Sequence, residues 1–181
     1  MLLQPNDQWR WFMGEDKHLM LDLGAEMLFS SPYLEKHLVY SASLEQCFSV
    51  EDTGLYYRFI DQLNTMGSSA QRVQAALNGV AVARFYKPLM PQSWFFEPQA
   101  DYHQPELGEL IGLDVENEQL TMMVVDTSPS ASVCISLSAP RLLSDSKQLN
   151  TFSAIKVMND RLVSLDTISN INDINDIRQV G

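Results

Sequence analysis

The chain is poor in positive charge and in long apolar runs, and each shortage excludes a class of function. Its 181 residues hold 12 Lys and Arg against 23 Asp and Glu, which gives a net charge of −11. Binding to nucleic acid or to an anionic membrane surface requires clustered cations, so neither partner is expected. No apolar run approaches the length of a membrane span, and the N-terminal residues lack the pattern of a signal peptide. These features predict a cytoplasmic bacterial protein.

Cysteine and histidine are also scarce. The two cysteines, Cys47 and Cys134, lie far apart in apolar surroundings, which predicts two buried, reduced thiols. The three histidines, His18, His37 and His103, have no second His or Cys at the spacing of metal ligands. The sequence therefore predicts neither a metal site nor a bound cofactor.

The motifs of common enzymes are missing as well. The chain has no Gly-x-Gly-x-x-Gly, no phosphate-binding loop and no Gly-x-Ser-x-Gly turn. Its acidic pairs, Glu15-Asp16 and Glu51-Asp52, are placed where a turn and a helix start are expected, so solvation or capping explains them. We therefore expect a non-enzymatic protein. The alternative is a module that senses a small ligand or a nucleotide, although the polar cluster that such a site needs is not visible.

The N-terminal part has the pattern of a hairpin followed by helices. Residues 9–13 and 19–23 alternate in polarity around a polar turn, and residues 27–29 are expected to add a third strand. Ser31-Pro32 has the residues of a helix start. Further on, Ser49 and Asp52 form the pattern of a capping box before a helix that ends near Gly67. Ser68 or Ser69 caps a second helix, which Pro88 ends.

The segment from Lys87 to Phe96, which we call the strap, is the most informative part of the chain. Its prolines, Pro88 and Pro91, exclude a helix and favour an extended backbone. It nevertheless carries the large apolar side chains of Met90 and Trp94, among others. A stiff segment of this kind either packs between domains or presents a docking site. The three tryptophans of the chain, Trp9, Trp11 and Trp94, are expected in the core.

The C-terminal part is expected to be all strand. Residues 97–118 are acidic and have the composition of a connection or an exposed edge. Short strands are expected at 120–125, 132–137, 141–143, 152–158 and 161–165, with a helix as the alternative at 154–158. Their spacing favours a small barrel. The prediction is thus an α+β, two-domain protein, with an N-terminal α/β domain and a small C-terminal β-barrel. The expected divisions are 1–90, strap and connection 91–118, barrel 119–166, and a flexible acidic tail 167–181.

The tail repeats Asn-Asp-Ile within residues 170–177. A calcium-binding loop would also need a turn glycine and a closing Glu, and both are absent. The repeat is therefore interpreted as part of a frayed acidic tail.

Four blocks of sequence resemble a known family when they are taken together and in order. They are Pro5-Asn6-Asp7-Gln8-Trp9-Arg10-Trp11, Met20-Leu21-Asp22-Leu23, Lys87-Pro88 with Met90-Pro91 and Ser93-Trp94, and Ala154-Ile155-Lys156 with Met158-Asn159-Asp160-Arg161-Leu162. In this arrangement the chain resembles the cell division protein ZapC family over residues 1–165. The resemblance implies an α/β domain followed by a β-barrel.

The resemblance also implies a partner. Members of the family bind the tubulin-like GTPase FtsZ at the division site, promote lateral association of its protofilaments and suppress its GTPase activity. Their partner binding is linked to an apolar pocket, which carries over to Leu21, and to a basic site at the strap, which carries over to Lys87. A second family lysine is Gln92 here, so more weight falls on Lys87 and on the apolar strap residues Pro88, Met90 and Trp94. With no heptad repeat visible, the chain is expected to be a monomer.

Overall fold

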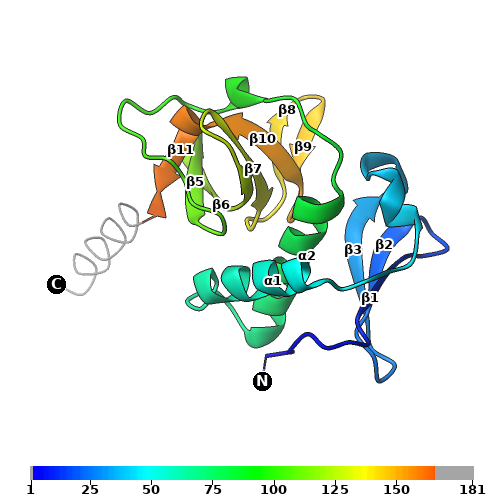
Figure 1. Ribbon diagram of the computed structural model, residues 1–181. Coiled ribbons are helices and arrows are strands. Elements are labelled where there is room, and N and C mark those ends of the chain that lie inside the picture. Colours follow the sequence, from blue (N-terminus) through cyan, green and yellow to red (C-terminus); the bar gives the residue numbers. More distant parts are fainter. Residues whose placement is uncertain (1, 166–181) are drawn as a thin grey trace. The chain divides into compact units, whose positions relative to one another are not determined.

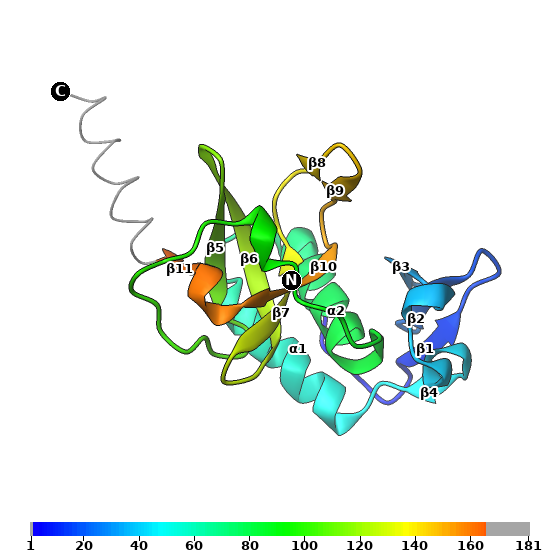
Figure 2. The same ribbon diagram turned by 90° about the horizontal axis from the view of Figure 1, so that it is seen from above.

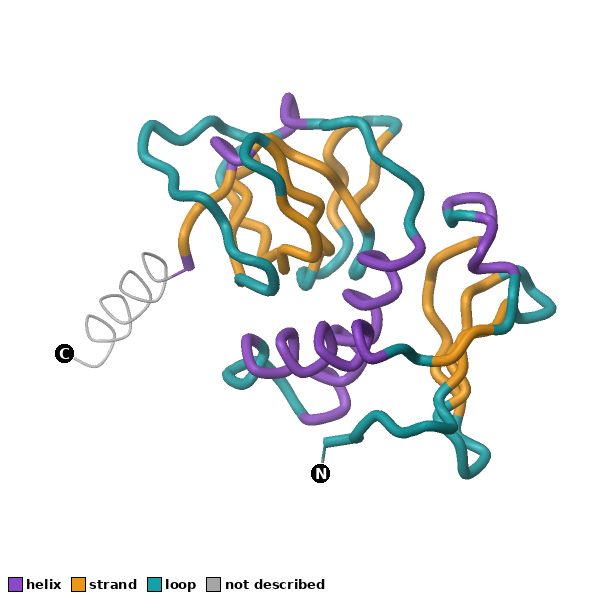
Figure 3. Tube along the Cα trace, in the orientation of Figure 1, coloured by secondary structure: helices purple, strands orange, loops and turns teal. Residues whose placement is uncertain are grey.

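The computed structural model describes residues 2–165, which form two compact units (Figure 1). The N-terminal unit contains residues 2–89 and 152–154, and the C-terminal unit contains residues 90–151 and 155–165. Helices are concentrated in the first unit, whereas the second is built almost entirely of strands (Figure 3). The predicted acidic tail, 167–181, lies outside the described residues.

The N-terminal unit combines an antiparallel sheet with two α-helices. Its elements are β1 (Arg10–Met13), β2 (His18–Asp22), β3 (Leu28–Leu34), η1 (Glu35–His37), η2 (Tyr40–Ser43), β4 (Gln46–Cys47), α1 (Val50–Gln62) and α2 (Ser69–Phe85). The strand order is β3-β2-β1-β4, which can be followed from above in Figure 2. The predicted hairpin and third strand are confirmed.

Ser31-Pro32 does not start a helix, so this prediction was wrong. Both residues lie within β3, and the Ser31 hydroxyl donates to the carbonyl of Leu19 at 2.7 Å. Proline is tolerated in an edge strand because its missing N–H is not needed there. The local Ser-Pro signal was thus overridden by pairing with the neighbouring strand.

The two α-helices begin where capping predicted. Ser49 and Asp52 form a reciprocal capping box at α1, and Ser68 and Gln71 form a second one at α2. The core between helices and sheet is rich in aromatic rings: those of Trp9 and Phe48 meet edge to face at 5.1 Å, and those of Trp11 and Phe85 at 5.6 Å. The predicted burial of Trp9 and Trp11 is confirmed.

The C-terminal unit has an open antiparallel sheet and a separate hairpin. Its elements are η3 (Ser93–Phe95), β5 (Leu110–Val115), β6 (Glu118–Thr127), β7 (Ala131–Ser136), β8 (Arg141–Ser144), β9 (Lys147–Leu149), β10 (Ala154–Met158), η4 (Asn159–Arg161) and β11 (Leu162–Ser164). The five-stranded sheet has the order β10-β7-β6-β5-β11, and β8 pairs only with β9. Residues 154–158 form a strand, so the helix alternative is excluded.

The predicted β-barrel is not formed, because the sheet does not close. Closure would require the two edge strands, β10 and β11, to pair with each other. Instead, the strap joins β10: Pro91 forms a parallel bridge with Lys156, and the Gln92 amide donates to the Lys156 carbonyl at 2.8 Å. A short 3₁₀ turn, η4, separates β10 from β11, which has only three residues.

One strand of this sheet was not predicted. β5 lies within the segment that was interpreted as a connection, and it pairs with both β6 and β11. Its side chains of Ile111 and Leu113 are fully buried in the core of the unit. Gly112 and Asp114 interrupt the apolar pattern, which explains why the sequence did not reveal this strand.

Candidate partner-binding surfaces

Leu21 lies inside the N-terminal unit rather than on its surface. The residue is 0% exposed, and in the sheet it is paired with Trp11 on β1 and with Phe29 on β3. A side chain in this position cannot contact a partner directly. It can only support the residues around it, and these include Phe29.

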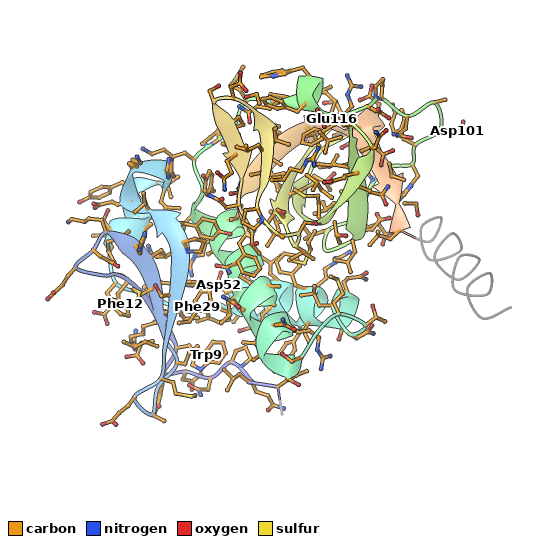
Figure 4. The ribbon with its side chains drawn as sticks, turned by 180° about the vertical axis from the view of Figure 1, so that it is seen from behind. Trp9, Phe12, Phe29, Asp52, Asp101 and Glu116 are labelled. Atoms are coloured by element: carbon orange, nitrogen blue, oxygen red, sulfur yellow. The ribbon has the colours of Figure 1, made fainter. Side chains whose placement is uncertain are left out.

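An open groove with a volume of about 580 Å³ lies beside this position, between the start of β3 and the first half of α2. Phe29 projects from β3 and is half-buried (Figure 4). The apolar lining residues are Leu3, Leu23, Leu28, Phe29, Val73 and Leu77, and the small or polar ones are Ser30, Ser69, Ala70 and Gln74. None of these side chains is charged. In a chain with a net charge of −11, the groove is thus an apolar surface without a carboxylate.

The residues that line the groove were not predicted from the sequence, and the reason is physical. Its walls come from the N-terminal segment, from β3 and from α2, which only the fold brings together. The N-terminal segment is fixed by a hydrogen bond of 2.7 Å from the Tyr56 hydroxyl to the Leu3 carbonyl. Leu28 marks the groove in the structure, because it is a large apolar residue that is 58% exposed. The sequence shows that the residue is apolar but not that it is exposed.

Lys87 is exposed and lies just after α2. Its ammonium group donates to the carbonyl of Lys36 at 2.9 Å, and its backbone amide donates to the carbonyl of His37 at 2.9 Å. Lys36 is exposed as well, so two exposed lysines lie close to each other in the N-terminal unit. Burial raises the pKa of the neighbouring Tyr86, so that phenol stays neutral at physiological pH and adds no negative charge here.

The strap belongs to the C-terminal unit from Met90 onward, and its apolar side chains divide between two environments. Phe96 is buried in the core, whereas Met90 is 82% exposed and Trp94 is 70% exposed. The prediction that Trp94 is a core residue was therefore wrong. Pro88, which precedes this part of the strap, is also exposed.

Trp94 is exposed on a backbone that is firmly held. The Ser93 hydroxyl accepts a hydrogen bond from the Met158 amide at 2.8 Å, and the Ser93 carbonyl accepts one from Arg161 Nε at 3.2 Å. The 3₁₀ turn η3 therefore fixes Trp94 in position, and the indole of Trp94 lies against the ring of Phe95, at a ring distance of 5.5 Å. A rigid aromatic side chain that reaches into solvent is typical of a binding anchor.

Other kinds of site were searched for in the same way. Among residues 2–165, no group of three or more His, Cys, Asp or Glu side chains could hold a metal ion. No helix in that range is long and apolar enough to cross a membrane. Within residues 2–165, the groove, the Lys87 surface and the strap are the candidate partner-binding surfaces.

Comparison with known proteins covers almost the whole chain. Residues 2–87 match the family model described as Cell-division protein ZapC, N-terminal, and residues 88–167 match Cell-division protein ZapC, C-terminal. The border between the two models falls at the start of the strap, close to the division between the compact units.

Three curated relatives illustrate the similarity, and each is named Cell division protein ZapC. The protein from Aeromonas hydrophila subsp. hydrophila is 42% identical over 164 residues, which cover 90% of this chain and 92% of that protein. Those from Photobacterium profundum and Xenorhabdus bovienii are 36% and 38% identical, with coverage of 91% and 90% of this chain and 94% and 92% of the relatives. The chain therefore belongs to the cell-division protein ZapC family.

Proposed function

We propose that this chain is a non-enzymatic cell division factor that binds FtsZ at the division site in the cytoplasm. Bound to the polymer, it promotes lateral association of protofilaments, stabilises them and lowers their GTPase activity. The observation that carries this proposal is the match of both halves of the chain to the ZapC family models. The FtsZ partner and its bundling come from the family that the sequence resembles.

The exposed features support binding to an acidic protein filament. The groove beside β3 is apolar and free of carboxylates, and the strap presents Met90 and Trp94 to solvent. Lys87 and Lys36 form a local positive surface on an otherwise acidic chain. Such a surface steers an acidic partner at short range although the two net charges repel each other. We assign Lys87, Pro88, Met90 and Trp94 to partner contact.

Leu21 has a supporting role in this proposal. It is paired within the sheet with Phe29 on β3, the strand whose residues Leu28 and Phe29 line the groove. We therefore assign the direct contact to the groove residues and the support of the groove to Leu21. The chain is proposed to act as a monomer with both surfaces on one molecule.

The alternative, a small-ligand module, depended on a binding site in the mouth of a barrel. The open sheet of the C-terminal unit offers no such mouth among its described residues. No specific observation favours that alternative.

Co-sedimentation tests the proposal. The purified chain is mixed with FtsZ and GTP, the polymer is pelleted, and phosphate release is measured in the same samples. We expect the chain in the pellet with GTP but not with GDP, together with a lower rate of GTP turnover by FtsZ. A chain that stays in the supernatant, or one that hydrolyses GTP without FtsZ, would contradict the proposal.

A further inference from the structure

One wall of the groove is the edge of β3, which carries backbone hydrogen-bonding groups. β3 is an outer strand of its sheet, with β2 as its neighbour. The Leu23 amide donates to the Met27 carbonyl at 2.9 Å, which sets the hydrogen-bonding register of the hairpin. Peptide groups in an antiparallel strand alternate between the two sides, so those of Leu28 and Ser30 point away from β2. Among the described residues, they have no partner on that side.

The length of this free edge is limited. Pro32 follows at the next outward position of β3 and has no N–H to donate. The edge can therefore pair only over a short stretch at the start of β3, the same stretch that lines the groove. The free edge of β3 therefore lies beside the apolar part of the groove, which has Phe29 on one wall and Val73 and Leu77 on the other.

The wall of the groove opposite β3 is formed by α2, and the N-terminal end of this helix carries partial positive charge. Ser69 and Ala70, which line the groove, form the first turn of α2, where the amide groups carry a partial positive charge. The capping box uses the amides of Ser68 and Gln71, so the amides of Ser69 and Ala70 stay without a partner in the described part of the chain.

A full positive charge lies next to this turn. Arg72 Nη2 donates to the Ser69 hydroxyl at 3.4 Å, and its Nε is buried without a hydrogen-bond partner. No carboxylate is present among the residues that line the groove. A negatively charged group of a ligand would therefore be favoured at this end.

We propose that the groove binds an extended segment of the protein partner, which pairs with β3 as an additional strand. Its apolar side chains lie against Phe29, Val73 and Leu77, and an acidic residue lies at the first turn of α2. The occupant is thus a short, extended peptide segment that combines apolar residues with a carboxylate. Strand addition of this kind derives affinity from the backbone and specificity from alternate side chains. This inference rests on the proposed binding of FtsZ.

Removal of one outward N–H tests strand addition. Ser30→Pro deletes the amide that would bond to the added strand, while the bonds of β3 to β2 are unaffected because this amide points outward. Ser30→Ala is the matched control, since it removes the hydroxyl and keeps the amide. In co-sedimentation with FtsZ and GTP, we expect Ser30→Pro to weaken binding by up to about tenfold, the factor for one lost backbone hydrogen bond, and Ser30→Ala to change it less than about twofold.

A second pair of variants tests the acidic residue. Ala70→Glu adds a carboxylate at the first turn of α2, where helix stability benefits from it but an acidic ligand is repelled. Ala70→Gln has a similar size without the charge. We expect Ala70→Glu to weaken binding about tenfold at low salt and less at high salt, and Ala70→Gln to bind as the unmodified chain does. Equal binding of both variants would overturn this part of the proposal.

Hydrogen exchange of the unmodified chain locates the contact. With FtsZ polymer bound, we expect exchange at residues 28–30 to slow about tenfold or more. Unchanged exchange there, with the chain in the pellet, would overturn strand addition and leave the proposed function intact. Slower exchange that depends on the concentration of the chain without FtsZ would assign the edge to a second copy and also overturn the proposal. If the unmodified chain does not sediment with FtsZ, the proposed function itself fails.

Discussion

The indole of Trp11 donates a hydrogen bond from Nε1 to Oδ2 of Asp52 at 3.0 Å, in the interior of the N-terminal unit. The same carboxylate oxygen accepts the Ser49 amide at 2.9 Å and forms an ion pair with Arg84. Arg84 in turn donates to the Gln46 side chain at 2.8 Å. One buried carboxylate therefore connects β1, the cap of α1 and α2 directly, and β4 through Arg84; α2 also lines the groove.

Asp52→Asn should destabilise the N-terminal unit strongly. The substitution removes the negative charge that compensates Arg84, a side chain that is only 25% exposed. Breaking a buried ion pair from one side costs about 3 kcal/mol or more. Glu51→Gln is the matched control, because Glu51 is an exposed carboxylate in the same helical turn, and it should change stability by less than about 0.5 kcal/mol. Urea unfolding followed by circular dichroism measures both, and equal stabilities would show that the Asp52 network contributes nothing.

Stability should also fall at alkaline pH because of Cys134. Burial raises the pKa of this thiol from 9.0 to about 12. The unfolded chain thus loses the proton near pH 9 while the folded chain keeps it. This contribution to the free energy of unfolding is fully present below pH 9 and is lost as pH rises towards 12.

Two variants separate this titration from packing. Cys134→Ala should flatten the decline of stability between pH 9 and pH 12, because the titrating group is gone. Val124→Ala, at the position paired with Cys134, should lower stability equally at every pH and keep the slope. Urea midpoints at several pH values provide the measurement, and an unchanged slope in Cys134→Ala would assign the decline to other groups, such as Tyr56, whose pKa burial raises to about 12.

The contrast between Leu21 and Leu28 should separate folding from binding. Leu21 is fully buried and Leu28 is 58% exposed at the groove. Leu21→Gln places an amide in the core and should cost about 2 kcal/mol or more. Leu28→Gln should change stability by less than about 0.5 kcal/mol and weaken FtsZ binding by about 1 kcal/mol or more. Thermal melts beside co-sedimentation decide this, and normal binding by Leu28→Gln would remove the groove from the interface.

Local signals predicted much of the fold, and long-range contacts decided the rest. The capping residues Ser49 and Ser68 act on their own helix starts, so the sequence alone placed them correctly. Trp94 shows the limit, because its hydrophobicity predicts burial, whereas the hydrogen bonds of Ser93 turn it outward. The groove lies beyond local prediction for the same reason: Phe29 and Val73 meet only after the sheet and α2 have packed.

Lys87→Glu should weaken FtsZ binding in a salt-dependent way. The side chain is exposed, so folding is not affected, but the surface shared with Lys36 loses its net positive charge. Attraction between exposed charges is screened over about 8 Å at physiological ionic strength, so the loss should be largest at low salt. Lys147→Glu makes the same change in net charge within the C-terminal unit and serves as the control. Equal losses at all salt concentrations would indicate that Lys87 acts by packing.

Bundling should require both the groove and the strap. A monomer can link two protofilaments only if it carries two FtsZ-binding surfaces, and we assign these to the groove in the N-terminal unit and to Met90 and Trp94 in the C-terminal unit. Leu28→Gln removes part of the groove and Trp94→Ala removes the exposed indole of the strap, whose loss does not disturb the core. Each single variant should still pellet with FtsZ polymer but fail to increase light scattering, because one contact remains while the linkage is lost.

The double variant should stay in the supernatant, and Leu142→Ala, a change at an exposed residue outside the strap, should bundle normally. Electron microscopy beside the scattering assay distinguishes decorated single filaments from bundles. If binding and bundling decrease together in every single variant, the two surfaces act as one site and the bridging must come from a dimer.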